Sequence, residues 1–568
     1  MRVKLRKLTE IRQQISNFKN CFKRNFSVTT NLYYNMKRII TSLFLVAAAF
    51  QAQAQAPTVT LVKDIFPGFE GSSIRAATEF NGKLYFNADD GIHAEELWVT
   101  DGTEAGTQLV KDISTIGNSS ITELTVVNNK LVFSANDATH GIELWVTDGT
   151  EAGTVMLKDI AAGIGNSVPS NFKKFGNQII FTANDGINGE EIWATDGTSE
   201  GTFLVKNINP AGGSSFPYGF IELNGKLFFQ ADNGVNGIEL WATDGTEAGT
   251  TMIKDIFAGG DSYPRSFATL NGKLYFRADD QRGDELWASD GTAEGTVFVK
   301  DINTAEGDGS SINEFTELNG KLLFRARDEA SSFELWSTDG TAEGTVMVKD
   351  IWPGEGASFP GALIRFKDKV YFQATDGIHN TELWASDGTA EGTSMVKDIH
   401  PTDYSAPNEF IEYNGLLYFV AIDGTNGSEL WVTDGTEART TKIRPDDAVS
   451  PLYFIPFFKV YNGQLFFKAE FGTTGAEWWK LETAPLATVS QNAKAGSIVY
   501  PNPVADKLNI NLKNSSIQSV AVYSVSGVKV LESKNQQSID VSGLNSGVYF
   551  VKIQNDKNEV FYNKIIKN

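Results

Sequence analysis

The sequence predicts an all-β protein: a β-propeller of about nine four-stranded blades, closed by strands from both ends of the repeat array, and then a small C-terminal β-sandwich. A unit of about 47 residues recurs nine times between Pro57 and Thr483, and self-similarity at such a period is typical of propellers and other arrays. Each unit holds four short runs of alternating apolar and polar residues separated by turn residues, as antiparallel strands do. The units share a tryptophan, found at Trp98, Trp145, Trp193, Trp241, Trp287, Trp336, Trp384, Trp431 and Trp479.

The fifth unit shows the predicted strands. Residues 267–270 and 273–278 form two runs joined by Asn271-Gly272, the strongest short hairpin signal because both positions tolerate a positive φ. A polar loop leads to a third strand over 285–289, and Asp290-Gly291-Thr292 turns the chain into a fourth strand over 297–302. Asn-Gly recurs at the same place in six of the nine units, at Asn81, Asn224, Asn271, Asn319, Asn414 and Asn462.

The two ends of the array, residues 57–482, predict how a ring would close. The array opens with a lone fourth strand over 58–65 and ends after a third strand over 477–481. Pairing these two strands completes one blade and removes a free sheet edge. Nine blades exceed the usual number, so eight blades, or an open or distorted ring, stay as alternatives.

Residues 36–56 predict a secretory signal peptide. A basic start, Met36-Lys37-Arg38, precedes an apolar run over 39–50 and two Ala-x-Ala cleavage patterns over 52–56. The apolar run is too short to span a membrane. Residues 1–35 are basic and lack a strand pattern, so we expect them to be a wrongly assigned extension, with translation beginning at Met36; an unusually long leader is the alternative.

The charge of the chain limits its partners. Net charge is -21 over 568 residues, although residues 1–56 carry ten Lys/Arg and one acid. We therefore expect no nucleic-acid partner, because phosphate binding needs a basic face, whereas cations and neutral or basic ligands fit better. The only cysteine, Cys21, lies in the basic N-terminal stretch, so no disulfide framework is expected in the exported chain.

The C-terminal segment, residues 497–568, predicts a separate β-sandwich. It follows a linker over 483–496 that is rich in Ala, Thr, Ser, Asn and Gln, and it carries eight basic and five acidic residues. Strand patterns separated by turn residues fall at 508–512, 517–524, 528–533, 537–541, 547–554 and 560–566. A compact module on a flexible linker can be handled independently of the repeats.

The repeat phrase Glu-Leu-Trp-x-x-Asp-Gly-Thr-x-x-Gly-Thr resembles the signature of the bacterial ELWxxDGT repeat family. That family consists of secreted and surface proteins and implies no settled activity. The eighth unit departs from the phrase because it has Arg439 in place of the second Gly. The ninth unit, at 476–480, lacks the Asp-Gly-Thr turn.

The tail resembles the type A C-terminal sorting domain of type IX secretion in Bacteroidetes. Its matching blocks lie at 499–503, 508–510, 522–527, 544–550 and 564–567. The resemblance implies export through the inner membrane, recognition by the type IX machinery and its sortase, and a product that is released or attached to the outer-membrane surface. It assigns the sorting motif to Tyr500, Pro501, Asn502, Pro503, Gly527, Gly547, Tyr549, Lys564 and Lys567.

The acids that recur in every unit have two interpretations. One Glu position is occupied in all nine units, and we expect a structural hydrogen bond there because a buried carboxylate must be partnered. Six residues earlier, most units carry another acid on a Gly- and Asn-rich loop. Oxygen ligands on such a loop suit Ca²⁺, while Asp-Gly is also ordinary turn chemistry. The candidate calcium ligands are Asp90, Glu96, Asp185, Glu191, Asp376 and Glu382.

Three histidines share one loop position. His93, His140 and His379 stand where other units carry Asn. Both residue types are enriched at left-handed backbone positions. We therefore expect turn residues there, not zinc ligands or members of a catalytic triad.

Arginines break the pattern in two neighbouring units. Arg277 and Arg325 share one strand position, and Arg327 lies close to the second. They predict a basic spot that could hold a carboxylate or sulfate ligand; neutralisation of nearby Asp residues is the alternative.

The sequence favours a secreted or surface-displayed binding protein. Long loops between units, such as 66–73 and 209–218, carry Phe, Ser and Gly, a mix suited to adaptable contact with a glycan or protein ligand. We assign no catalytic residue, because no phosphate-binding loop or nucleophile elbow is present. The alternative is an extracellular polysaccharide lyase or hydrolase on the same scaffold, since a fold alone does not decide function.

Overall fold

The computed structural model describes residues 58–443 except 331, 355 and 426, residues 452–482, and residues 497–567 except 513–515, 525–528, 545–546 and 558–559. The regular structure of these residues is almost entirely β-strand, and the one short 3-10 helix among them is η1 (Glu437–Arg439). No helix in the described ranges is long and apolar enough to cross a membrane. The predicted extension 1–35, the predicted signal peptide 36–56, the linker 483–496 and Gly527 lie outside the described residues.

Eight four-stranded antiparallel sheets, each built from four consecutive strands, follow one another through the described part of residues 77–442. The first four sheets comprise β2 (Ala77–Phe80), β3 (Lys83–Asp89), β4 (Glu95–Thr100) and β5 (Gln108–Lys111); β6 (Thr122–Val127), β7 (Lys130–Asn136), β8 (Ile142–Thr147) and β9 (Val155–Lys158); β10 (Ser170–Phe175), β11 (Gln178–Asn184), β12 (Glu190–Thr195) and β13 (Phe203–Lys206); and β14 (Tyr218–Leu223), β15 (Lys226–Asp232), β16 (Ile238–Thr243) and β17 (Thr251–Lys254).

The next four sheets repeat the pattern. They comprise β18 (Arg265–Leu270), β19 (Lys273–Asp279), β20 (Asp284–Ser289) and β21 (Val297–Lys300); β22 (Asn313–Leu318), β23 (Lys321–Arg327), β24 (Phe333–Thr338) and β25 (Val346–Lys349); β26 (Gly361–Phe366), β27 (Lys369–Thr375), β28 (Thr381–Ser386) and β29 (Ser394–Lys397); and β30 (Asn408–Tyr413), β31 (Leu416–Ile422), β32 (Ser428–Thr433) and β33 (Thr441–Lys442).

The ninth sheet joins the two ends of the array. Its order is β1-β36-β35-β34, with β1 (Thr58–Leu61), β34 (Leu452–Tyr461), β35 (Gln464–Phe471) and β36 (Thr474–Glu482). The first strand runs antiparallel to β36, with Thr60 opposite Lys480. The predicted pairing of the two ends is therefore observed. The all-β class is confirmed, and the succession of four-stranded sheets is consistent with a β-propeller.

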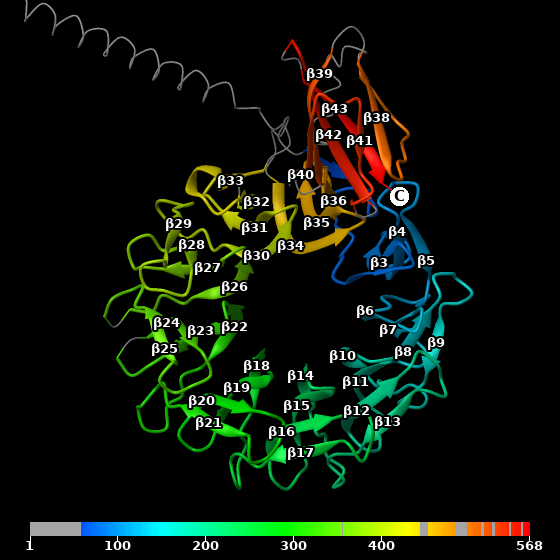
Figure 1. Ribbon diagram of the computed structural model, residues 1–568. Helices are drawn as coiled ribbons and strands as arrows, with labels where there is room; N and C mark the ends of the chain where they lie inside the picture. Colours follow the sequence, from blue (N-terminus) through cyan, green and yellow to red (C-terminus); the bar gives the residue numbers. More distant parts are fainter. Residues whose placement is uncertain are drawn as a thin grey trace, which may run out of the picture. The chain divides into compact units, whose positions relative to one another are not determined.

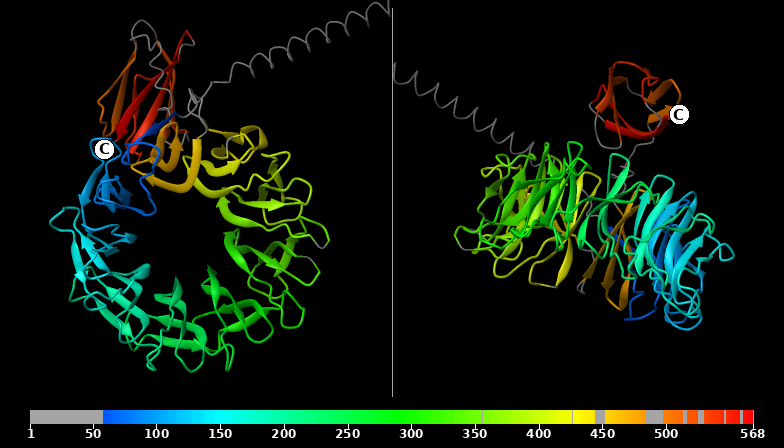
Figure 2. Two further views of the ribbon diagram at one scale, coloured as in Figure 1. Left: turned by 180° about the vertical axis from the view of Figure 1, so that it is seen from behind. Right: turned by 90° about the horizontal axis from the view of Figure 1, so that it is seen from below.

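The first strands of successive sheets lie side by side. The contacts run from β2 to β6 and on through β10, β14, β18, β22, β26, β30 and β34. Figure 1 shows these strands nearest the common centre of the nine sheets, and Figure 2 shows the same succession from behind. The ninth sheet contacts the first, because the Tyr461 hydroxyl donates a 2.8 Å bond to the Gly82 carbonyl and Phe86 packs against Trp478. Each sheet thus has a neighbour on both sides.

Apolar side chains fill the spaces between neighbouring sheets. One cluster joins Leu223, Phe228 and Leu240 of the fourth sheet to Phe276 and Trp287 of the fifth. The recurring tryptophans are only 5–7% exposed, and a buried aromatic ring of this size removes a large apolar area from water. The repeat tryptophan is therefore part of the packing between sheets, as the sequence predicts.

Turn chemistry explains where the strands begin and end. At Asn271-Gly272 the φ angles are +51° and +74°, and Leu270 pairs directly with Lys273 across the turn. Two successive positive φ values define the two-residue hairpin that Asn-Gly favours. The predicted first hairpin of the unit is confirmed.

The Thr-Asp-Gly-Thr-x-x-Gly-Thr part of the repeat phrase forms a hydrogen-bonded turn between the third and fourth strands. In the fourth sheet Asp244 accepts bonds from the backbone N–H (2.9 Å) and hydroxyl (2.6 Å) of Thr246. The Thr250 hydroxyl donates to the Thr246 carbonyl and lies 2.7 Å from the Thr243 hydroxyl. A Cβ at Gly249 would lie 2.0 Å from the Asp244 carboxylate. The phrase is therefore a turn whose second Gly leaves room for the Asp.

The tail forms two sheets around one core. One sheet contains β37 (Ser497–Tyr500), β38 (Lys507–Leu512) and β41 (Ser538–Asp540); the other contains β39 (Ile517–Ser524), β40 (Lys529–Lys534), β42 (Gly547–Asn555) and β43 (Val560–Lys567). Leu508 and Ile510 of the first sheet share a cluster with Val520, Val522 and Val551 of the second. Two sheets that share a core make a β-sandwich. The strand at 497–500 was not predicted.

Candidate functional site

In every unit except the eighth, the shared glutamate ties the third strand to the loop that follows the sheet. In the fourth sheet the Glu239 carboxylate accepts bonds from the backbone N–H of Ile256 (2.7 Å) and Phe257 (3.3 Å) and from the Ser262 hydroxyl (2.7 Å). The side chain is fully buried, and this burial raises the pKa of Glu239 to about 7. A buried carboxylate with three donors is a structural group, as the sequence led us to expect.

The predicted calcium ligands lie in separate local networks. Asp185 accepts bonds from the backbone N–H of Ile187 (2.9 Å) and Asn188 (2.7 Å) and from the Asn188 amide (2.7 Å). Asp90 and Asp376 make the matching bonds in their own loops. Glu96, Glu191 and Glu382 accept bonds from backbone N–H groups, as Glu239 does. Within the described residues, no three His, Cys, Asp or Glu side chains are grouped as a metal site would need.

One unit holds a cation of its own between these two acid positions. In the eighth unit the Lys442 ammonium lies 2.5 Å from the Asp423 carboxylate and 2.7 Å from that of Glu429. These acids are the equivalents of Asp376 and Glu382 in the seventh unit. Calcium binding in the other units stays a prediction, and comparing the melting temperature in chelator and in excess calcium would test it.

The three histidines are turn residues, as expected, but the left-handed backbone that favoured this expectation does not fall on them. The imidazoles of His93, His140 and His379 bond the Asp three residues earlier at 2.7–2.9 Å, which raises the pKa of each histidine. The positive φ falls on the following residue, for example +57° at Ala94 and +54° at Asn380. The side-chain bond closes the loop, and the left-handed residue comes after it.

The three predicted ligand-binding arginines each have a partner of their own within the repeats. Arg277 lies 3.3 Å from Asp284, and Arg327 pairs with Asp308. Arg325 stacks over the Phe333 ring, with 5.5 Å to the ring centroid. Anion binding by these arginines stays a prediction. Arg277 nevertheless has a basic neighbour, since Arg265 lies directly opposite it on the adjacent strand β18.

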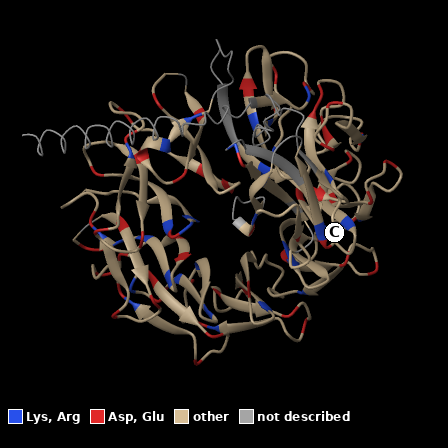
Figure 3. Cartoon of the chain, turned by 45° about the horizontal axis from the view of Figure 1, so that its top comes forward, with Lys and Arg blue, Asp and Glu red and all other residues tan. Residues whose placement is uncertain are grey.

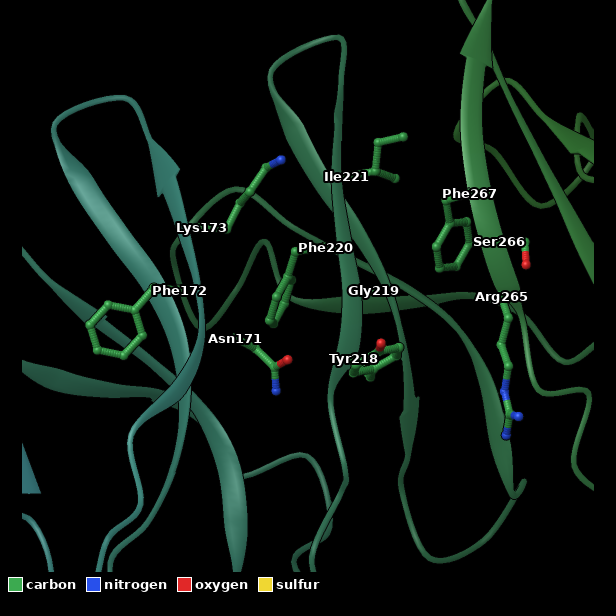
Figure 4. Close-up of a pocket in the computed structure, with 10 residues that line it drawn as sticks. All are labelled: Asn171, Phe172, Lys173, Tyr218, Gly219, Phe220, Ile221, Arg265, Ser266 and Phe267. Atoms are coloured by element: carbon green, nitrogen blue, oxygen red, sulfur yellow. The ribbon is translucent and has the colours of Figure 1, made fainter. Parts of the chain in front are cut away.

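A pocket of about 430 Å³, named here the inner-strand pocket, opens at the first strands of the third, fourth and fifth sheets. Figure 4 shows the Phe220 ring and the Asn171 side chain between β10 and β14, and the Phe267 ring between β14 and β18. The ten lining residues include amide, hydroxyl, ammonium and guanidinium groups but no carboxylate and no imidazole. They are Asn171, Phe172, Lys173, Tyr218, Gly219, Phe220, Ile221, Arg265, Ser266 and Phe267.

A β-bulge near the start of the first strand, present in units two to eight, shapes the pocket. The register of β14 shifts between Tyr218 and Ile221, so Gly219 and Phe220 lack partners on β15. Bulges insert an unpaired residue and re-aim the local backbone. The first bulged residue has a positive φ in units two to eight, at Glu123, Asn171, Gly219, Ser266, Glu314, Ala362 and Glu409.

A glutamate of the preceding sheet binds the N–H groups of the bulge in two places. The Glu123 carboxylate accepts bonds from the backbone N–H groups of Asn171 (3.2 Å) and Phe172 (3.1 Å). Glu314 likewise accepts a 3.4 Å bond from the Leu363 N–H. A carboxylate is therefore the group that this bulge binds when the neighbouring sheet supplies one.

The inner-strand pocket lacks this carboxylate. The equivalents of Glu123 there are Asn171, whose amide donates to Thr182 in its own sheet (3.2 Å), and Gly219, which has no side chain. No carboxylate of the described residues accepts a bond from the N–H groups of Gly219, Phe220, Ser266 or Phe267. A comparison of this one position along the repeats would have found the site in the sequence.

Two cations and one free aromatic ring border the pocket. Neither Lys173 nor Arg265 has a carboxylate partner among the described residues, and the Arg265 guanidinium stacks over Tyr263, 4.6 Å from its ring centroid. Tyr218 is 58% exposed, whereas Phe220 and Phe267 pack against rings of their own sheets. Figure 3 shows charges of both signs spread over the repeats, so this basic pocket is a local feature.

The residues of the predicted sorting motif meet around the last strand of the tail. Asn502 stands between Pro501 and Pro503 in the sequence. Its amide oxygen accepts a 2.8 Å hydrogen bond from the backbone N–H of Ile566. On β42 and β43 Gly547 pairs with Lys567 and Phe550 with Lys564. Tyr549 is buried and Tyr500 is half exposed. Their recognition as a motif stays a prediction.

Comparisons with solved structures give only distant likenesses. A prolyl endopeptidase is 12% identical with a TM-score of 0.35, and the match covers 64% of this chain and 56% of that protein. An extracellular domain assigned to a one-component system of B. thetaiotaomicron is 10% identical with a TM-score of 0.25, over 91% of this chain and 98% of that domain. Likenesses at this level carry no argument about activity.

Comparisons of sequence identify the tail. An ulvan lyase of Nonlabens ulvanivorans is 36% identical over 93 residues, which are 16% of this chain and 17% of the lyase, so the chain spans less than a fifth of that relative. Residues 498–568 match the family described as the secretion system C-terminal sorting domain. The chain therefore ends in a type IX sorting domain and is secreted, to the cell surface or the extracellular space.

Proposed function

We propose that this protein is a non-catalytic binding protein, displayed on the cell surface or released from it, whose nine sheets form a closed propeller that holds a glycan or protein ligand. The contacts between successive sheets and the ninth sheet shared by both chain ends support a closed ring. The sorting domain supports the location.

The lining of the inner-strand pocket carries the proposal of binding without catalysis. Acid–base chemistry needs a positioned group such as His, Asp or Glu within hydrogen-bond reach of the reacting atoms. The pocket instead offers amide, hydroxyl and cationic donors beside an exposed aromatic ring. Exposed apolar side chains on the loops, including Phe69, Ile92 and Ile187, add contact surface of the kind found at interaction sites.

A polysaccharide-degrading enzyme is the second candidate. The 93-residue likeness to an ulvan lyase favours it. A propeller fold alone does not decide between binding and catalysis. The two candidates differ in whether a bound polymer is cut.

Screening the exported protein on glycan and protein arrays, with product analysis of every retained polymer, tests the proposal. We expect retention of a ligand whose chain length is unchanged after prolonged incubation. Shortening of any polymer by the purified protein would establish the enzyme in place of the binding protein.

A further inference from the structure

We infer that the inner-strand pocket binds the carboxylate of a uronic acid residue in a glycan whose other sugars are neutral. This inference rests on the proposed binding function and adds the chemical class of the ligand and the atoms that hold it. The bond donors are the backbone N–H groups of the bulges at Gly219-Phe220 and Ser266-Phe267.

A contact of the same kind is already present within the chain. Glu123 presents two carboxylate oxygens to two successive backbone N–H groups, at 3.2 Å and 3.1 Å. Successive N–H groups in a turned backbone form an anion-binding concavity, and bonds to an ionised acceptor are roughly twice as strong as neutral ones. In the fourth and fifth sheets no glutamate takes this place: both bulges line the pocket, and the Phe267 ring lies against Gly219.

Cations replace the missing internal carboxylate at the pocket. Lys173 and Arg265 extend from the two outer strands of the three that form it (Figure 4). Figure 4 shows them at opposite ends of the pocket, and the lining contains no acid, so the pocket as a whole is basic. Arg265 is held against the Tyr263 ring, so less side-chain entropy is lost on binding.

The shape and surroundings favour a sugar with an isolated charge. The volume of about 430 Å³ lies in the range of small-ligand sites, and the free Tyr218 ring offers an apolar face with a polar tip. The Asn171 amide and the Ser266 hydroxyl can exchange hydrogen bonds with sugar hydroxyl groups. The net charge of -21 disfavours a dense polyanion, so a spaced uronate fits better than a continuously charged polymer.

Asn171→Glu tests the inference, because it gives the pocket the internal carboxylate that Glu123 supplies one sheet earlier. Titration calorimetry with a xylotriose that carries one glucuronic acid branch, a tetrasaccharide with a single carboxylate, would measure binding by the exported protein. We expect the Kd to rise at least tenfold in Asn171→Glu and at least fivefold in Arg265→Gln. Asn171→Gln, which keeps the size but adds no charge, should change it less than threefold. Asn177→Glu adds the same charge at an exposed hairpin residue and should have no such effect.

Three probes distinguish the sources of a carboxylate. The neutral methyl ester of this tetrasaccharide should bind at least tenfold more weakly than the acid, and acetyl-Gly-Glu-Gly-amide, which also carries one carboxylate, should bind more weakly than the sugar. Equal binding of the ester, tighter binding of the peptide, no binding of the acidic tetrasaccharide, or an unchanged Kd in Asn171→Glu would overturn the inference.

The proposed function can fail separately. An array ligand that Asn171→Glu still retains would leave the binding function standing and overturn the uronate site alone. Cleavage of a retained polymer would overturn the proposed function, whatever the pocket binds. Circular dichroism and melting curves of each variant would confirm that the fold is intact.

Discussion

The glutamate common to all units is stabilised by hydrogen bonds and destabilised by burial when it is charged. Glu239 has three donors, yet its pKa is raised from 4.5 to about 7 because its carboxylate is removed from water. Glu96, Glu285 and Glu477 show the same value for the same reason. One residue position therefore gives most units of the array a response to pH, because the pKa of Glu143, Glu191, Glu334 and Glu382 is also raised by burial.

This response predicts that the repeats melt at a higher temperature at pH 5 than at pH 8. Between about pH 5 and pH 7 the folded protein binds more protons at Glu239 than the unfolded chain does, so the free energy of unfolding falls as pH rises. His93 acts in the same direction, because the stabilisation from its bond to Asp90 is present below pH 6.5 and is lost as pH rises through its raised pKa. Differential scanning calorimetry across this range would measure the slope.

Glu239→Gln is the control for this pH response, because an amide does not titrate. The variant should melt lower at pH 5 and lose less stability between pH 5 and pH 8 than the parent. The aspartates whose pKa is lowered, such as Asp244, oppose the trend only below about pH 4. A melting temperature that rises steadily from pH 5 to pH 8 would contradict the assignment.

Glu123 and Glu409 occupy the same repeat position but differ in their contacts. Glu123 bonds two backbone N–H groups of the next sheet, and no such bond is found for Glu409 in the described residues. Glu123→Ala should therefore lower the free energy of unfolding by about 1–3 kcal/mol, because it leaves those donors unpaired. Glu409→Ala should change it by less than about 0.5 kcal/mol. Urea denaturation would measure both, and equal effects would refute a structural role for the Glu123 contact.

At the scale of the element, the turn between the third and fourth strands decides how long the fourth strand is. The eighth unit shows this, because Arg439 replaces the second Gly of the phrase. Its turn becomes the short helix η1, and β33 has two residues where the fourth strands of the seven preceding sheets have four. In the other turns a Cβ at this Gly would collide with the Asp carboxylate. The replacement of the second Gly by Arg439 is therefore accompanied by a different turn and a shorter fourth strand.

Gly249→Ala should destabilise the fourth sheet by about 1–3 kcal/mol, as overpacking in a tight site does. The added methyl group would displace the Asp244 carboxylate from the Thr246 N–H and hydroxyl. Chemical denaturation would give the loss, and hydrogen exchange of β17 would locate it. Ala248→Gly, one residue earlier, is the control and should cost less than about 1 kcal/mol. Unchanged protection of β17 in Gly249→Ala would show that the turn adapts.

In the tail, Asn502 connects the segment before β38 to the last strand. Asn502→Ala removes the acceptor of the Ile566 N–H, so we expect β43 to loosen and the secreted fraction of the protein to fall at least severalfold. Comparing cell-bound and extracellular protein by immunoblot would measure the change. Asn511→Ala, at an exposed position on β38, is the control. Normal export of Asn502→Ala would show that recognition does not depend on this bond.

At the scale of the whole molecule, local chemistry and the pairing of the two ends of the array could be predicted from the sequence, whereas the side-chain contacts that shape the pocket could not. Asn271-Gly272 and the Asp-Gly-Thr turns depend on neighbours in the chain, so the strands were placed within a few residues. The inner-strand pocket lacks an internal carboxylate because Asn171 and Gly219 stand at the position of Glu123. These two positions are about 48 residues apart in the chain. The histidines were correctly expected in turns, but their side-chain bonds to Asp90, Asp137 and Asp376 were not expected, because backbone statistics do not contain side-chain contacts.

The last prediction concerns the pairing of the two ends of the repeat array, β1 and β36. Thr60 of β1 lies opposite Lys480 of β36, and directly opposed residues of antiparallel strands bring their Cβ atoms to about 4.5–5.5 Å, close to what a disulfide needs. Thr60→Cys combined with Lys480→Cys should therefore form an intramolecular disulfide in the exported protein. A bridge across so long a loop should add about 2–4 kcal/mol, and dithiothreitol should abolish the gain. Each single variant, and Thr60→Cys combined with Gln108→Cys on the first sheet, should give no such gain. Disulfide-linked dimers in place of a closed monomer would mean that the ends of the array do not meet within one chain.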